Sequence, residues 1–113
     1  MDKLTRRLML FDFYGALLTD KQKEVYDLYY QQDLSLGEIA EIWQVSRASV
    51  YDLLRRTEQG LEKYEAALAL LDDFNQREQI LKSLSECLEA GDKEIPESWR
   101  DRLHALISEL VSI

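Results

Sequence analysis

Between positions 46 and 56, three arginines stand close to hydroxyl side chains and a single aspartate. The polar residues that a helix over this stretch would place on or beside its outer face are Arg47, Ser49, Tyr51, Asp52, Arg55 and Arg56. Arginine can bond guanine edges or phosphates, and hydroxyl groups suit phosphate or base contacts. The aspartate would accept a hydrogen bond from cytosine but repel a phosphate. The stretch therefore predicts contact with a nucleic acid.

The same stretch has the apolar spacing of an amphipathic helix. If Val50 points toward a core, Leu53, Leu54 and Thr57 fall within about 60° of it at about 100° per residue. Ser46 precedes the helix as a good N-cap. A helix of this kind in a DNA-binding protein presents its N-terminal part to the major groove. We therefore expect the arginine-bearing side to face outward.

A second, shorter helix is predicted just before the first. Ser35 and Glu38 have the spacing of a capping box, in which each side chain bonds the other residue's backbone amide. Leu36, Ile39, Ala40 and Trp43 follow at helical spacing, and small Ala40 would allow two helices to cross closely. After a break at residues 44–45, the next helix begins. This spacing is typical of a helix-turn-helix over residues 34–56; the alternative is two amphipathic helices of an unspecialised bundle.

Two more helices are expected before this motif. The first covers residues 3–14 and ends at Gly15, with Leu4, Leu8, Phe11 and Leu18 available for burial. The second follows Thr19, which has Gln22 at its capping-box position and an inner face of Val25, Leu28 and Tyr29. Lys21 and Lys23 lie in its first turn. They are candidate contacts to a nucleic-acid backbone, unless they are simply solvated surface charges.

The helix that carries the arginines shows no stop after Arg56, and Gly60 only weakens it. Apolar residues recur at heptad-like spacing as far as residue 71, so this helix is expected to reach Leu71. We predict a seam that pairs two copies of the chain, formed by Leu54, Leu61, Tyr64, Leu68 and Leu71. The alternative is that this stripe packs on the fifth and sixth helices of the same chain. Both arrangements could hold together.

The C-terminal part is expected to be a helical pair. Residues 72–75 look like a break with caps, a fifth helix covers about residues 76–88, and Gly91 would close it. Cys87 is predicted to be a small core residue of that helix. Pro96 suits the first turn of a sixth helix. Two parts are therefore expected: a helix-turn-helix domain at 1–71 and an extension at 72–113 that packs on it or on a partner subunit.

Composition supports an all-α protein and argues against several functional classes. The chain has one Pro, four Gly, one Cys and one His, which leaves no disulfide, no metal-ligand spacing and no catalytic constellation. We expect no cofactor and no enzyme activity. We also expect no membrane span and no signal peptide, and hence a cytoplasmic protein.

The net charge is −8, which is unfavourable for a protein that approaches phosphates. Residues 1–56 hold eight basic and nine acidic residues, a net −1, whereas residues 57–113 hold six and thirteen, a net −7. The acidity therefore follows the motif. Within residues 46–56, three Arg and one Asp give a local +2. Nonspecific binding to nucleic acid should be weak.

The first half of the chain resembles region four of bacterial sigma factors. The matching stretches are residues 18–25, 34–41, 45–50 and 53–56. That resemblance implies a domain that reads a promoter element, with Arg47, Ser49 and Arg55 as base or phosphate contacts. Gln44 stands where that family's turn usually has Gly, and a positive φ there would be mildly unfavourable. No other sigma region is present.

Over its whole length the chain resembles the YlxM family of small helix-turn-helix proteins. The matching features include residues 10–15, residues 17–19, the long fourth helix and the acidic C-terminal pair. The genes of that family lie beside signal recognition particle genes, so the resemblance implies a link to that pathway or its regulation.

Three functions follow as hypotheses. The first is a dimeric regulator that binds double-stranded DNA. The second is a protein-interaction adaptor for signal recognition particle or ribosome components, in which the acidic half binds a basic partner. The third is binding to structured RNA, although the sequence lacks the aromatic platform that single-stranded recognition uses.

Overall fold

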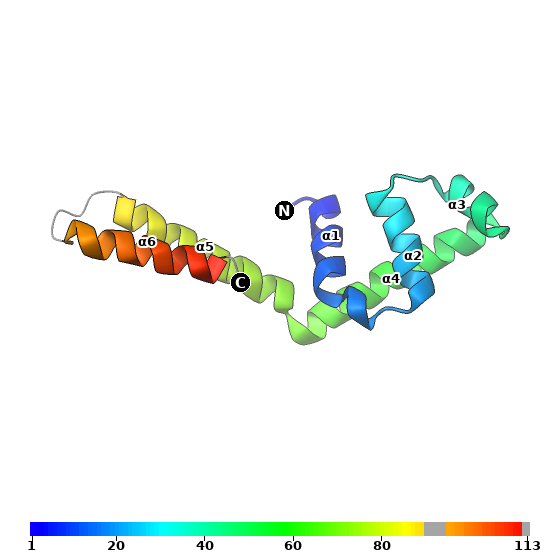
Figure 1. The fold of residues 1–113 in the computed structure, drawn as a ribbon. Coiled ribbons are helices and arrows are strands. Elements are labelled where there is room, and N and C mark those ends of the chain that lie inside the picture. The colour runs from blue at the N-terminus through cyan, green and yellow to red at the C-terminus, as the bar shows by residue number, and fades with distance from the viewer. Residues whose placement is uncertain (90–94, 112–113) are drawn as a thin grey trace. The chain divides into compact units, whose positions relative to one another are not determined.

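The computed structural model describes residues 1–89 and 95–111, and within these residues every regular element is helical. Two compact units divide the chain, Met1–Leu71 and Asp72–Ile113. In chain order the elements are α1 (Lys3–Tyr14), the 3-10 helix η1 (Gly15–Leu17), α2 (Asp20–Tyr26), the short π-helix η2 (Asp27–Gln31), α3 (Leu36–Trp43), α4 (Arg47–Leu68), α5 (Leu70–Glu89) and α6 (Glu97–Val111) (Figure 1). The fold is therefore the predicted all-α class, with a long α4 in the helix-turn-helix.

The helix starts follow the capping residues that the sequence contains. Thr19 accepts from the backbone amide of Gln22, and the Gln22 side chain accepts from the amide of Thr19. Ser35 and Glu38 form the same reciprocal pair at the start of α3. Each box satisfies amide groups that a helix N-terminus would otherwise leave unbonded. Both predicted capping boxes are confirmed.

The turn between α3 and α4 is closed by Gln44 in the left-handed conformation, with φ 57°. This conformation lets the amide of Val45 donate to the carbonyl of Ala40 at 3.0 Å, which ends α3. The side-chain amide of Gln44 donates to the carbonyl of Glu41 at 2.8 Å and partly offsets the cost of a positive φ. The turn thus has the geometry that favours Gly, although Gln occupies it.

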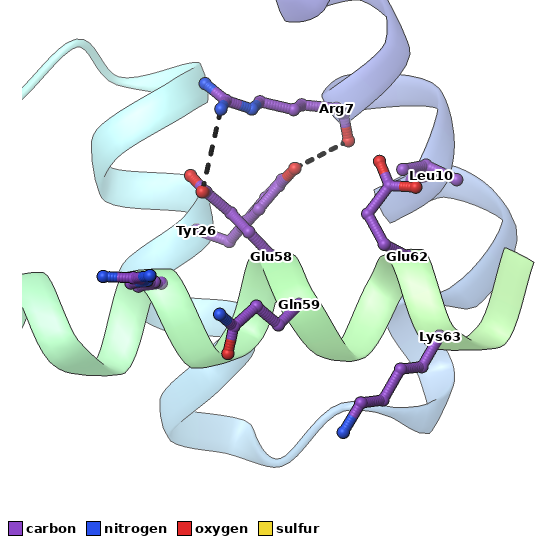
Figure 2. A pocket seen from close by; sticks show the side chains of 8 residues that line it. Arg7, Leu10, Tyr26, Glu58, Gln59, Glu62 and Lys63 are labelled. Carbon is purple, nitrogen blue, oxygen red and sulfur yellow. Dashed lines mark hydrogen bonds and ion pairs between the residues drawn. The ribbon is translucent and has the colours of Figure 1, made fainter. Parts of the chain in front are cut away.

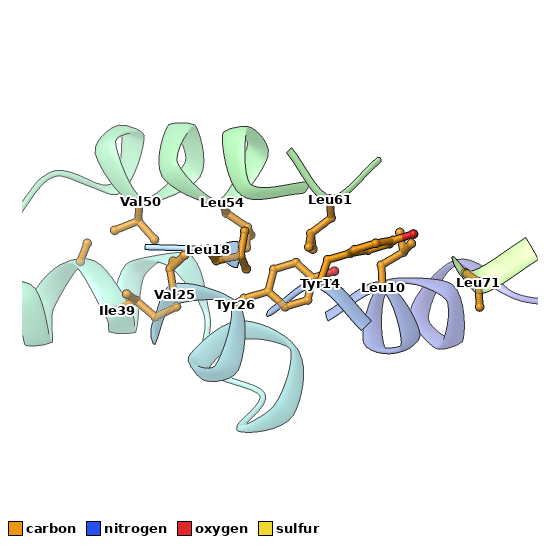
Figure 3. Packing of buried hydrophobic residues seen from close by; sticks show 11 residues of the cluster. Leu10, Tyr14, Leu18, Val25, Tyr26, Ile39, Val50, Leu54, Leu61 and Leu71 are labelled. Carbon is orange, nitrogen blue, oxygen red and sulfur yellow. The ribbon is translucent and has the colours of Figure 1, made fainter. Parts of the chain in front are cut away.

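In the N-terminal unit, α4 packs against α1, α2 and α3. Figure 3 shows side chains of α4 directed into a cluster with those of the shorter helices, including Leu10, Tyr14, Val25, Tyr26 and Ile39. Within the N-terminal unit, the apolar stripe of α4 is therefore covered by the helices that precede it.

Two expectations about burial need correction. In α1 the fully buried side chains are Leu10 and Tyr14, whereas Leu4 is exposed. Three of the predicted seam residues, Leu54, Leu61 and Leu71, are buried in the core of the unit. Tyr64 is half-buried against that core, and Leu68 is 52% exposed. In this conformation the three buried leucines cannot meet a second copy of the chain, because the chain's own helices already cover them.

The long helix ends at Leu68, and Ala69 takes a left-handed conformation with φ 54°. The next helix begins immediately at Leu70. The predicted end at residue 71 and the predicted break at 72–75 are therefore wrong: Asp72 and Asp73 lie in the first turn of α5, where acidic side chains favour the helix dipole.

The C-terminal unit contains α6 and the part of α5 that follows Leu71, and these two helices are antiparallel (Figure 1). Leu88 and Ile107 are its buried apolar residues among those described, and Cys87 is exposed, which corrects its predicted place in a core. Gly91, the expected end of the fifth helix, lies outside the described residues. Across residues 1–89 and 95–111, none of the helices combines the length and the apolar character that crossing a membrane requires.

Candidate nucleic-acid interface

The six residues predicted to face outward on α4 are all exposed: Arg47, Ser49, Tyr51, Asp52, Arg55 and Arg56. We call this set the reading face. The opposite side of the same helix buries Val50 and Leu54 at 1% and 5% exposure. Buried and exposed residues therefore alternate with the helical period, so one side of α4 is fixed in the core while the other faces solvent.

The N-terminus of α4 is capped by Ser46, the residue that precedes the helix. The hydroxyl of Ser46 accepts from the amide of Ser49 at 3.1 Å, and the two hydroxyl oxygens lie 2.7 Å apart. Arg47 is the first residue of the helix and is exposed. The N-terminal end of a helix dipole favours a phosphate, so Arg47 adds charge at an end that already attracts anions.

The two predicted lysines of α2 are placed differently. The ammonium of Lys21 lies 4.1 Å from the centre of the Trp43 ring, and the indole nitrogen of Trp43 donates to Glu24 at 3.1 Å. Lys21 is exposed and Lys23 is half-buried. Lys21 thus links the start of α2 to the end of α3 while keeping its charge at the surface.

A hollow of about 610 Å³ lies beside α4 (Figure 2), and Arg55 of the reading face is one of the residues that line it. Its lining includes Arg7, Arg55 and Lys63 as cations and Glu58 and Glu62 as anions. A neighbouring hollow of about 310 Å³ is lined by residues that include Arg7, Tyr51 and Arg55. Tyr51 and Arg55 of the reading face therefore border a concave surface that α1 helps to form.

Arg7 belongs to this surface, although no sequence pattern predicted it. Its guanidinium lies 3.7 Å from the carboxylate of Glu58 and 5.4 Å from the centre of the Tyr30 ring, and its backbone carbonyl accepts from the hydroxyl of Tyr26 at 2.9 Å (Figure 2). No helical spacing connects residue 7 with residues 30 and 58. The contact depends on how α1 and η2 pack on α4.

Tyr30 fixes Glu58 from the other side by donating its hydroxyl to that carboxylate. Burial raises the pKa of Tyr30, and the bond to Glu58 raises it further, so the phenol stays protonated and remains a donor. Glu58 is therefore held by Arg7 and Tyr30 behind the reading face. Its charge is partly neutralised there, which favours the approach of an anion to Arg55.

The reading face carries three positive charges and one negative charge, because Asp52 lies among the arginines and is exposed. Nothing in the described part of the chain groups three or more His, Cys, Asp or Glu side chains in a way that could hold a metal ion. The arrangement provides hydrogen-bond donors and positive charge on a rigid helix, which suits recognition of a polyanion.

Comparison with known proteins agrees with this geometry. The family model described as "Putative helix-turn-helix protein, YlxM / p13 like" matches residues 1–100. The UPF0122 protein YlxM of Bacillus subtilis (strain 168) is 52% identical over 83% of this chain and 84% of its own length. A UPF0122 protein of Exiguobacterium sp. is 51% identical over 81% and 86%. The chain therefore belongs to the YlxM/p13-like family of helix-turn-helix proteins.

Proposed function

We propose that this protein is a regulatory protein that binds double-stranded DNA through the reading face of α4. The observation that carries the proposal is the exposure of Arg47, Arg55 and Arg56 on a helix whose other side is locked in a core. A recognition helix must be held rigidly by its neighbours and must leave its polar side free for the major groove. The membership of a helix-turn-helix family supports the same function.

Each side chain has a distinct expected role. Arg47 and Arg55 would donate to guanine edges or to phosphates, and Ser49 and Tyr51 would donate to phosphates or bases. Asp52 would accept from cytosine and would penalise any register that brings it to a phosphate. Lys21, with Lys23 behind it, would contact the backbone beside the groove.

A homodimer would present two reading faces to half-sites about 34 Å apart, or a multiple of that distance. The gene neighbourhood implied by the family resemblance suggests that the regulated process is the signal recognition particle pathway. The acidic character of residues 57–113 favours a second candidate, an adaptor that binds a basic protein of that pathway.

Selection of bound sequences from a random pool of duplex DNA tests the proposed function. The full chain should enrich a motif, and the enrichment should be lost in Arg55→Ala. Arg77→Ala is the matched control, because Arg77 is also an exposed arginine on a helix but lies in the C-terminal unit. Both variants lose one positive charge, so a difference between them reports position and not net charge.

Recovery of no enriched motif would contradict the proposal, as would equal loss of binding in the two variants. A motif that survives Arg55→Ala would place recognition elsewhere on the chain. Loss of a single bidentate contact to guanine should reduce specific binding by a factor of about 10 to 100.

A further inference from the structure

The C-terminal unit exposes an unusual amount of apolar surface for so small a pair of helices. Ile80 and Leu84 of α5 are 65% and 45% exposed, and Trp99, Leu106 and Leu110 of α6 are 67%, 46% and 59% exposed. We call these five residues the hairpin face. Single exposed apolar residues are ordinary on a protein surface, but a contiguous group of this kind marks an interaction site.

Helix geometry places all five residues on the same side of the pair. Leu81 of α5 and Ile107 of α6 line a common hollow and so mark the sides on which the two helices meet. At about 100° per residue, Leu84 and Ile80 lie about 60° and 100° around α5 from Leu81. The two helices are antiparallel (Figure 1). A residue of α6 that is rotated from Ile107 by the same angle and in the same sense therefore lies on the same side of the helix pair as Ile80 and Leu84.

On α6 that offset is occupied by the other three members of the hairpin face. Measured from Ile107, Leu110 lies about 60° around the helix, Trp99 about 80° and Leu106 about 100°, all in the same sense as on α5. The hairpin face is therefore a single apolar surface that extends over both helices. A pair of helices with one apolar face can bury that face by packing against another such pair, and the result is a four-helix bundle.

The spacing along α6 is that of a helix that pairs with its own antiparallel copy. Trp99, Leu103, Leu106 and Leu110 are separated by four, three and four residues, a heptad pattern that reads the same in both directions. Around a twofold axis between Leu103 and Leu106, Leu103 would meet Leu106 of the second copy. Trp99 would meet Leu110 in the same way, so each large side chain has an apolar partner.

The charges beside this stripe are complementary in the same antiparallel register. Arg102 and Glu109 are both exposed and are separated by one heptad on the same flank of the stripe. In an antiparallel pair, residues at equivalent flanking positions approach one another, so Arg102 of one copy would face Glu109 of the other. The twofold axis makes this pair occur twice. In a parallel pair, Arg102 would instead face the apolar Ile107.

The area is also sufficient for a specific association. The five side chains together expose on the order of 500 Å² of apolar surface, close to the largest patch of an ordinary monomer. With its polar rim, burial of this face in both copies approaches the roughly 1,200 Å² that marks the lower limit of a specific interface.

From these observations we infer that the hairpin face is a homodimer interface, in which α5 and α6 of two chains form an antiparallel four-helix bundle. This surface differs from the predicted seam on α4, whose leucines at positions 54, 61 and 71 are buried within the chain. The inference is independent of what the reading face binds.

Sedimentation equilibrium of the full chain, over concentrations from about 1 to 100 µM, tests the inference. The wild type should approach twice the 13.3 kDa mass of one chain. Leu106→Glu should be monomeric throughout this range. Leu68→Glu is the matched control, because Leu68 is a leucine of similar exposure, 52% against 46%, on α4. It should remain dimeric, and circular dichroism should show unchanged helix content in both variants.

The charge pair gives a second test that does not disturb the apolar face. Arg102→Glu alone and Glu109→Arg alone should each weaken the dimer by roughly tenfold, because each places two like-charge pairs across the twofold axis. The double variant should recover most of the loss. A wild type that stays monomeric at the highest concentration would overturn the inference. So would a dimer that Leu68→Glu dissociates while Leu106→Glu does not, or charge reversals without mutual rescue.

Discussion

Removal of one buried hydroxyl, in Tyr14→Phe, should measurably destabilise the N-terminal unit. The hydroxyl of Tyr14 donates to the carboxylate of Glu65 at 2.7 Å and accepts from the backbone amide of Leu70 at 3.0 Å. The same carboxylate oxygen accepts from the amide of Leu71 at 2.9 Å. Tyr14 is 1% exposed and Glu65 is 8% exposed. Tyr14 and Glu65 therefore accept hydrogen bonds from the first amides of α5. The first amides of any helix have no acceptor within the helix itself.

The magnitude follows from which groups lose a partner. A hydrogen bond to a charged acceptor contributes about 1.5–3 kcal/mol, and a buried carboxylate that loses a donor is not easily rehydrated. The amide of Leu70 can form a hydrogen bond with water instead, because Leu70 is 42% exposed. We therefore expect the free energy of unfolding to fall by about 2 kcal/mol. Tyr64→Phe is the control: its ring lies 5.9 Å from that of Tyr14, and no described residue hydrogen-bonds its hydroxyl, so the loss should stay below about 0.5 kcal/mol.

Urea unfolding followed by the fluorescence of Trp43 measures this difference, since Trp43 belongs to the N-terminal unit. The second tryptophan is first replaced by Trp99→Phe, so that one unit alone is reported. Equal stability of Tyr14→Phe and Tyr64→Phe would refute the role assigned to the hydroxyl. A change in the denaturant slope of Tyr14→Phe alone would indicate a less compact native state instead.

The remaining predictions concern Ala69 and Gln44, which are two of the residues with positive φ, and one ion pair. Ala69→Gly should raise the free energy of unfolding by about 0.5–1 kcal/mol, because Gly adopts a positive φ without steric cost. Gln44→Gly should gain less in the same urea assay, because it also loses the side-chain bond to a backbone carbonyl. The hydrogen bond from Arg6 lowers the pKa of Glu62. The pair therefore stabilises the fold fully at a pH above the ordinary pKa of this carboxyl. This stabilisation is lost as the pH falls through the lowered pKa. Glu62→Gln should therefore cost no more than about 0.5 kcal/mol at pH 7, since the pair is half-exposed. The difference from wild type should disappear once the pH is below the lowered pKa of Glu62. A cost that grows on acidification would contradict this assignment.

Much of the fold was predictable, because local signals dominate an all-helical chain. Ser35 and Glu38 cap α3 as their spacing indicates, and Val50 and Leu54 are buried as the period of α4 requires. These features depend only on residues three or four positions apart, and such distances leave a period in the sequence. The outward position of the arginines followed from the same period.

Contacts between distant residues were not predictable. The approach of Arg7 to Glu58 and Tyr30, and the bonds of Tyr14 to Glu65, join positions separated by tens of residues and leave no periodic signal. The end of α4 was misplaced because an alanine in the left-handed conformation is not a recognised stop. At the junction of α4 and α5, Glu65 accepts hydrogen bonds from the hydroxyl of Tyr14 and the amide of Leu71. Composition alone does not reveal these contacts.

The most direct test of DNA binding by the reading face is the salt dependence of affinity for duplex DNA, measured in parallel with a structured RNA. Arg47, Arg55, Arg56 and Lys21 are the exposed cations expected to approach phosphates. Four such contacts per chain predict a slope of log affinity against log salt of about −3 to −4. Arg55→Ala should reduce that slope by about one, and Arg77→Ala should leave it unchanged. A slope near zero for duplex DNA, or a dependence seen only with RNA, would contradict DNA binding through α4.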